Sequence, residues 1–77
     1  MRIYGSMLCP DCGECCKDLD AAGTAYTFCD FSDDLRHLKE FLKLRDTMDI
    51  FEEIKAEGKI GIPCILHDDG KVSLTWK

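Results

Sequence analysis

The stretch MRIYGSMLCPDCGECCKDLDAAGTAYTFCDF, residues 1–31, decides the fold of this 77-residue chain. It predicts a strand over residues 2–5, a helix from Pro10 to about Gly23, and a second strand over residues 26–31. Proline suits the first helical turn because its missing N–H would have no partner there, and glycine suits a helix end. Two strands joined through a helix are typical of a parallel pair with a right-handed crossover.

The predicted helix carries an apolar face at the spacing i, i+3, i+4 and i+7. Cys12, Cys15, Cys16 and Leu19 form this face. Free cysteine is often buried as a small apolar residue, so we expect Cys15 and Cys16 to pack in the core. We expect the same of Cys29, which falls within the second strand.

The middle of the chain predicts two further helical pieces. Ser32 is expected to cap the first of them. Its buried stripe is expected to consist of large apolar residues, namely Leu35, Leu38, Phe41 and Leu42. The pattern breaks around residues 46–47, and a second piece, with its own apolar face, ends at Glu57-Gly58.

The tail predicts a β-hairpin. Residues 62–67 read as one strand, Asp69-Gly70 indicates a type I′ turn, and Val72, Leu74 and Trp76 alternate along the next strand. The order is β-α-β-α-β-β. We therefore expect one α/β domain over residues 1–77, with a small four-stranded mixed sheet.

Charge and composition exclude several classes of function. The chain has 15 acidic and 10 basic residues, a net charge of −5, which argues against nucleic acid as a partner. Its apolar runs are too short to cross a membrane, and its start lacks the apolar core of a signal peptide. We expect a cytoplasmic protein, in a reducing compartment where clustered thiols indicate redox chemistry or metal rather than structural disulfides.

The motif Cys9-Pro10-Asp11-Cys12 stands where the first strand gives way to the helix. The start of a helix presents unpaired N–H groups and partial positive charge, which stabilise a thiolate at Cys9. Cys12, one turn on, can resolve a mixed disulfide formed at Cys9. Asp11 and Glu14 oppose the thiolate, so we expect a comparatively reducing pair.

This arrangement resembles the glutaredoxins, small proteins of the thioredoxin fold, over residues 2 to about 76. Their active site has the form Cys-Pro-x-Cys after the first strand, and a cis-proline loop precedes their third strand, as Gly61-Ile62-Pro63 does here. The likeness is greatest to glutaredoxin-related proteins with aspartate in the active-site loop. The resemblance implies a thioredoxin-like domain that functions in cell redox homeostasis through a redox-active disulfide.

The resemblance also assigns roles to individual residues. It implies that Cys9 is the nucleophile and Cys12 the resolving thiol, both catalytic. It implies that Pro63 is a cis-proline that helps to dock a substrate backbone. The remaining substrate-binding positions that it implies are Pro10, Asp11, Ile62 and Cys64.

Three departures from the glutaredoxin pattern argue against glutathione as the co-substrate. Ser6 stands where glutaredoxins commonly carry lysine, and residues 73–75 lack their Gly-Gly pair. We also expect the final helix of the family to be absent, and Trp76 therefore to be exposed unless residues 49–57 cover it or two chains pair. We expect a monomer or a weak homodimer, reduced by an external thiol or a reductase.

The function expected from these observations is thiol–disulfide exchange on protein or low-molecular-weight disulfides, which requires no cofactor. The alternative is a thiolate metal-binding module that uses Cys9, Cys12 and either Cys64 or Cys15. Cys9, Cys12 and Cys15 reproduce the first three ligands of a bacterial ferredoxin motif, although the fourth is absent. Zinc or copper would suit a site of three thiolates. A third possibility is a redox-regulated binding domain with little turnover.

Overall fold

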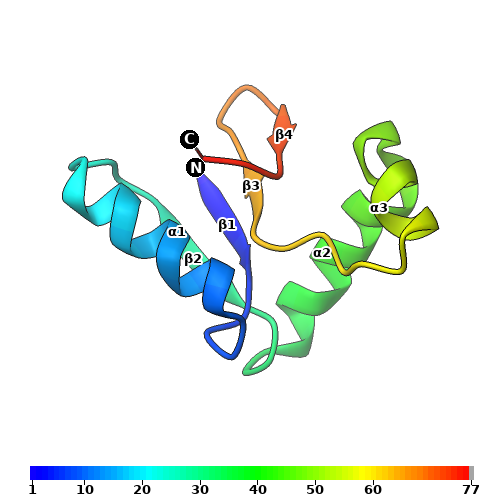
Figure 1. The fold of residues 1–77 in the computed structure, drawn as a ribbon, viewed down its shortest axis with the longest axis horizontal. Coiled ribbons are helices and arrows are strands. Elements are labelled where there is room, and N and C mark those ends of the chain that lie inside the picture. The colour runs from blue at the N-terminus through cyan, green and yellow to red at the C-terminus, as the bar shows by residue number, and fades with distance from the viewer. Residues whose placement is uncertain (77) are drawn as a thin grey trace.

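A four-stranded mixed sheet in the order β2-β1-β3-β4 forms the centre of this α/β fold (Figure 1). The computed structural model describes residues 1–76. The elements follow in the order β1 (Arg2–Gly5), α1 (Pro10–Ala21), β2 (Thr27–Asp30), α2 (Leu35–Thr47), the 3₁₀ turn η1 (Asp49–Phe51), α3 (Glu52–Ala56), β3 (Cys64–Leu66) and β4 (Val72–Ser73). This order and the mixed sheet confirm the expected α/β arrangement.

Strand β1 lies at the interior of the sheet and pairs on both sides. It runs parallel to β2, where Tyr4 stands opposite Cys29, and antiparallel to β3, where Tyr4 stands opposite Cys64. Strands β3 and β4 form the antiparallel hairpin. The parallel β1–β2 pair with α1 between them confirms the unit expected from residues 1–31.

The two faces of the sheet carry different clusters of buried side chains. On the α1 face, Ile3, Cys15 and Ile65 pack together, and half-buried residues including Leu19 and Trp76 cover them. The other face is covered by α2 and the α3 region, as the two sides of Figure 1 show. Its buried cluster consists of Tyr4, Cys29, Phe41, Phe51 and Cys64. Burial of each large apolar side chain contributes ~1.5–3 kcal/mol.

The first turn of α2 corrects one expectation. Asp34 caps this helix, accepting a hydrogen bond of 2.9 Å from the Arg36 backbone N–H. Ser32, the expected cap, instead donates its hydroxyl hydrogen to Asp30. A hydroxyl already held at the end of β2 cannot serve the helix, so α2 begins two residues later than the pattern indicated.

The buried side of α2 is also rotated from the expected stripe. Phe41 is buried, and Leu38 and Leu44 pack beside it, whereas Leu35 is 70% and Leu42 39% exposed. Each residue turns an α-helix by about 100°, so Leu42 points well away from Phe41. Positions three residues on either side of Phe41 lie closer to its direction and share its contact with the sheet.

The hairpin turn differs from the expected type I′. That turn needs a positive φ at both central residues, whereas Asp69 keeps an ordinary negative φ and Gly70 has a φ of 87°. The His67 carbonyl accepts from the Gly70 N–H at 2.9 Å, and the His67 N–H donates to the Lys71 carbonyl at 2.8 Å. These bonds define a three-residue loop with glycine in the left-handed position.

Trp76 is half-buried rather than exposed, which corrects the expectation for this residue. Its ring packs on the α1-side cluster, and its indole Nε1–H donates to Asp18 at 2.8 Å. Within the described residues, the structure holds no helix long and apolar enough to cross a membrane.

Candidate functional site

Cys9 occupies the N-cap position of α1, directly before Pro10. Its backbone is extended (φ −93°, ψ 122°), and its carbonyl accepts from the Cys12 N–H at 3.1 Å and the Gly13 N–H at 3.4 Å. Within the described residues, no side chain caps this helix. The half-buried Cys9 sulfur therefore lies at the positive end of a twelve-residue helix.

Cys12 lies one turn further on and is completely buried. Burial raises the pKa of its thiol to about 12, and the charge of Cys9 and a hydrogen bond with it act in the same direction. A hydrogen bond from the Ser6 backbone partly opposes the rise. Cys12 therefore retains its proton at neutral pH, while an external reagent meets Cys9 first.

The loop before Cys9 is held by a chain of hydrogen bonds through buried Ser6. The Ser6 hydroxyl donates to the Ser32 hydroxyl oxygen at 3.1 Å, and Ser32 donates in turn to Asp30. That bond from Ser32 keeps the pKa of Asp30 below its usual value. Ser6 also accepts from the Leu8 N–H at 3.1 Å through Oγ and from the Cys9 N–H at 3.0 Å through its carbonyl. The Cys9 backbone is thereby tied to the end of β2.

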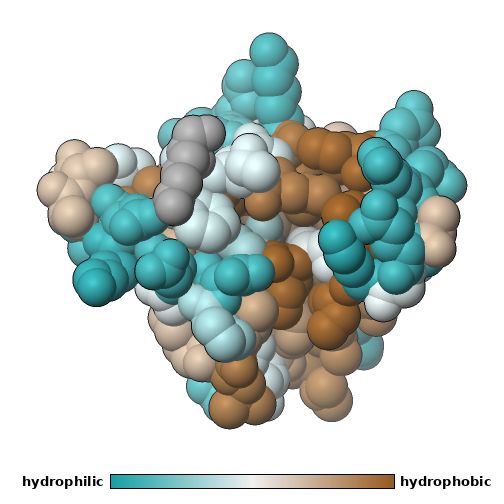
Figure 2. Space-filling model, in the orientation of Figure 1, coloured by the Kyte–Doolittle hydropathy of each residue, from teal (hydrophilic) through white to brown (hydrophobic). Residues whose placement is uncertain are grey.

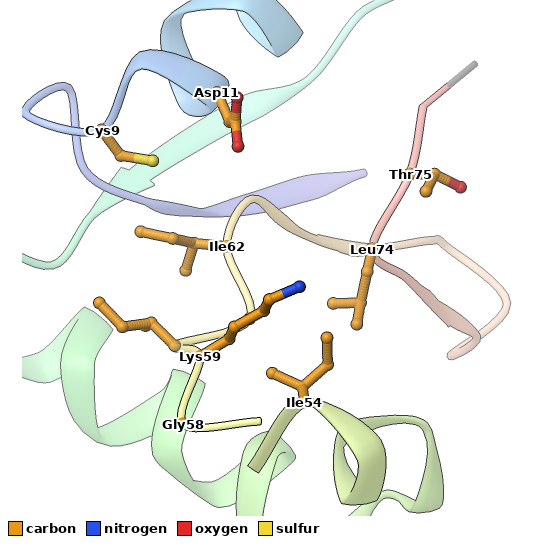
Figure 3. Close-up of a pocket in the computed structure, with 10 residues that line it drawn as sticks. Cys9, Asp11, Ile54, Gly58, Lys59, Ile62, Leu74 and Thr75 are labelled. Atoms are coloured by element: carbon orange, nitrogen blue, oxygen red, sulfur yellow. The ribbon is translucent and has the colours of Figure 1, made fainter. Parts of the chain in front are cut away.

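A cavity of about 600 Å³ opens beside Cys9. Figure 3 shows the Cys9 sulfur and the Asp11 carboxylate on one side of it, with the loop before β3 and the end of α3 opposite. The far wall and the remaining border consist mostly of apolar groups, contributed by Ile54, Gly58, Lys59, Ile60, Gly61, Ile62, Leu74 and Thr75. The candidate nucleophile thus faces a hollow large enough for part of a peptide.

The structure brings some of the expected site residues together and leaves others apart. Asp11 and Ile62 line the cavity with Cys9. The Ile62–Pro63 peptide bond is cis, as the resemblance implies, and Pro63 is buried behind the lining. Pro10 is exposed at the start of α1, outside the described cavity wall.

Cys64, another expected substrate contact, lies beneath the site rather than in it. It is fully buried in β3 among the α2-side cluster and does not line the described cavity. Burial raises the pKa of the Cys64 thiol to about 12. In this position Cys64 is a core residue, and a substrate in the cavity would not contact it.

Apart from Ile62, the far wall of the cavity was not predicted from the sequence. Arg45 of α2 donates to the backbone carbonyls of Lys59 at 2.8 Å and Ile60 at 2.9 Å, which holds this wall in place. Gly61 has a φ of 92°, and a Cβ there would lie 2.8 Å from the Phe51 ring. One signal in the sequence could have indicated this wall. Its residues directly precede Pro63, in the loop that the resemblance to glutaredoxins had already marked.

The possible metal ligands are distributed over separate parts of the fold. Cys15 packs with Ile3 in the α1-side cluster, where burial raises the pKa of its thiol to about 11. Cys64 belongs to the opposite cluster. Across residues 1–76, no three histidine, cysteine, aspartate or glutamate side chains are grouped so that they could hold a metal ion.

One relative resembles the chain along nearly all of its length. An uncharacterized protein of Haemophilus influenzae is 38% identical over 72 residues, which cover 94% of this chain and 84% of the relative. No family model and no solved structure matches the chain.

Proposed function

We propose that this chain, which belongs to the same family as the Haemophilus influenzae protein, is a thiol–disulfide oxidoreductase. In this proposal the Cys9/Cys12 dithiol reduces protein or low-molecular-weight disulfides, and the fold is a glutaredoxin-like version of the thioredoxin fold. The motif at the β1–α1 junction, the sheet order and the proline loop before β3 support that assignment. The proposal places the protein in the cytoplasm, where reducing conditions keep such a dithiol reduced.

The difference in exposure between the two thiols is the observation that carries the proposal. Cys9 is half-buried and faces a cavity at the positive end of α1, whereas Cys12 is fully buried one turn further on. In such a pair, each thiol performs one of the two steps of disulfide exchange. The accessible sulfur meets the substrate, and the buried sulfur attacks only the mixed disulfide beside it.

The reaction balances over two exchange steps. The Cys9 thiolate attacks one sulfur of the substrate disulfide, a mixed disulfide forms, and the first substrate thiolate leaves. Cys12 loses its proton and attacks the Cys9 sulfur, which releases the second substrate thiolate and leaves a Cys9–Cys12 disulfide. The two substrate thiolates take up protons, so the substrate gains two electrons and the protein loses two. An external thiol or a reductase then restores the dithiol.

Intact mass under controlled oxidation tests this proposal. Protein purified without oxygen should lose the mass of two hydrogens on mild oxidation, and peptide mapping should locate the bond between Cys9 and Cys12. With Cys12→Ser, the mixed disulfide at Cys9 should persist, because the resolving thiol is missing. The matched control is Cys16→Ala, which removes another buried thiol of α1 and should still form the internal disulfide.

Two results would contradict the proposal. One is a protein whose Cys9 and Cys12 stay reduced under mild oxidation and form no mixed disulfide with small disulfides. The other is a stoichiometric metal adduct that protects both thiols, which would favour the metal-binding alternative.

A further inference from the structure

We propose that the cavity beside Cys9 selects a polypeptide disulfide whose cysteine is flanked by apolar and basic side chains. This inference rests on the proposed oxidoreductase function and specifies its substrate. It depends on two features of the molecular surface, namely the exposed apolar groups around Cys9 and the distribution of charge along the cavity.

Two large apolar side chains remain exposed near the candidate nucleophile, one beside it in the sequence and one in the wall of its cavity. Leu8, directly before Cys9, is 87% exposed, and Ile60 in the opposite wall is 56% exposed. Figure 2 shows a hollow on this face of the molecule with apolar surface inside it and hydrophilic surface on either side. Exposed apolar groups gathered at a reactive site indicate contact with another apolar surface, here the residues beside a substrate cysteine.

A second, acidic hollow of about 250 Å³ adjoins the cavity at the start of α1. Asp11 and Thr75 border both spaces, and Glu14 and Trp76 complete the second. Asp11 and Glu14 stand at i and i+3, so their carboxylates lie on the same side of the helix. A segment that extends from Cys9 along this path meets two negative charges next to an aromatic ring.

Among the described residues of the cavity wall, positive charge is already engaged. Lys59 is the one basic side chain among the described lining residues, and its Nζ lies 2.9 Å from the Glu57 carboxylate. Arg45, behind the same wall, donates to backbone carbonyls. Electrostatic complementarity therefore favours a cationic segment over an anionic thiol such as glutathione.

Matched peptide disulfides test this selectivity. Two blocked peptides of equal length carry a leucine before a single cysteine, followed by two lysines in one and two glutamates in the other. Each cysteine is activated as a disulfide with 2-thiopyridine, so attack on the peptide sulfur by Cys9 releases thiopyridone. The protein is reduced beforehand and separated from excess thiol, so each molecule reacts once, and Cys12 releases the peptide thiol as the Cys9–Cys12 disulfide forms.

The rate constant for the lysine peptide should exceed that for the glutamate peptide about tenfold at low salt. The ratio should fall toward one at 1 M salt, where the screening length is about 3 Å. The double variant Asp11→Asn/Glu14→Gln should lose most of the preference for the lysine peptide. The control double variant Asp46→Asn/Glu53→Gln makes the same change in net charge at exposed residues that line neither cavity. It should retain the preference for the lysine peptide.

Neutral hydroxyethyl disulfide and glutathione disulfide complete the comparison. Equal rates with the two peptides, or faster exchange with glutathione disulfide, would overturn this inference while leaving the oxidoreductase function intact. A protein that reduces none of these compounds, including the neutral disulfide, would instead overturn the proposed function on which the inference rests.

Discussion

Gly5, the last residue of β1, lies directly against the sulfur of Cys12. A Cβ placed on Gly5 would be 2.6 Å from Cys12 Sγ, far inside van der Waals contact, and 3.6 Å from the ring of Phe28. The buried thiol of the candidate site therefore occupies the volume that a side chain at Gly5 would fill. This approach explains why glycine stands in a strand, where it is otherwise unfavourable.

Gly5→Ala should displace Cys12 and destabilise the protein by ~1–3 kcal/mol, the usual cost of overpacking a core. The displacement should also slow resolution of a mixed disulfide at Cys9. Chemical denaturation and single-turnover kinetics measure the two effects.

Gly13→Ala is the matched control on α1. Beyond the helix's own backbone, a Cβ there meets no heavy atom of the described residues within 4 Å. Alanine in a helix should raise stability by roughly 0.5–1 kcal/mol. Equal effects of the two substitutions would contradict the role assigned to Gly5.

Ser6→Ala should loosen the loop that carries Cys9. The substitution removes the acceptor for the Leu8 N–H and the donor to Ser32, at a cost of ~1–2 kcal/mol of unfolding free energy. Attack by Cys9 should slow by about tenfold, because small displacements of a reacting atom are costly. Ser73→Ala removes the hydroxyl that lies 2.6 Å from His67, away from the described cavity, and should lower stability without slowing attack.

The strand–helix–strand unit could be predicted from sequence because its limits are local. Pro10 begins α1, and Gly23, with a φ of 71°, follows its end. The start of α2 was harder to predict, because serine and aspartate are both good N-cap residues. The Ser32 hydroxyl is held by a local bond to Asp30 and by a bond from Ser6, 26 residues away in the sequence, and this second, tertiary contact cannot be seen in the local pattern.

Only one side of the candidate site could be predicted from the sequence. Cys9 and Cys12 follow from a motif read along one segment, so sequence was sufficient to mark them. The opposite wall follows from distant contacts, namely Arg45 to the Ile60 carbonyl and Gly61 to the Phe51 ring. No periodicity within residues 58–62 indicates these partners.

Gly61→Ala should distort that wall. A Cβ would lie 2.8 Å from the Phe51 ring, and the φ of 92° is itself unfavourable for alanine. Gly70→Ala separates the two causes, because Gly70 has a φ of 87° and no heavy atom of the described residues within 4 Å of such a Cβ. The Gly61 variant should lose ~1–3 kcal/mol more in thermal or chemical unfolding. An equal loss would show that the contact with Phe51 carries no energy.

Asp11→Asn should make the dithiol less reducing. The Asp11 carboxylate borders the same cavity as Cys9 and repels a thiolate there, so its removal stabilises the reduced form. A stabilised reduced form raises the reduction potential, by about 10–20 mV for a gain of ~0.5–1 kcal/mol. Equilibration with a dithiothreitol couple measures the change. Glu53→Gln, outside the described cavity lining, is the control, and an unchanged potential in Asp11→Asn would contradict the charge argument.

The stability of the reduced protein should fall steeply in alkaline solution. Burial raises the pKa of both Cys12 and Cys64 to about 12, whereas a cysteine in an unfolded chain titrates near 8.5. Above about pH 9 the unfolded chain releases protons that the native protein retains, so the free energy of unfolding decreases as pH rises. Cys64→Ala should make this slope shallower by about 1.4 kcal/mol per pH unit. Ile65→Val, a loss of buried volume at the next residue without a titrating group, should lower stability equally at every pH. Parallel slopes for wild type and Cys64→Ala between pH 9 and 11 would show that Cys64 ionises in the native state.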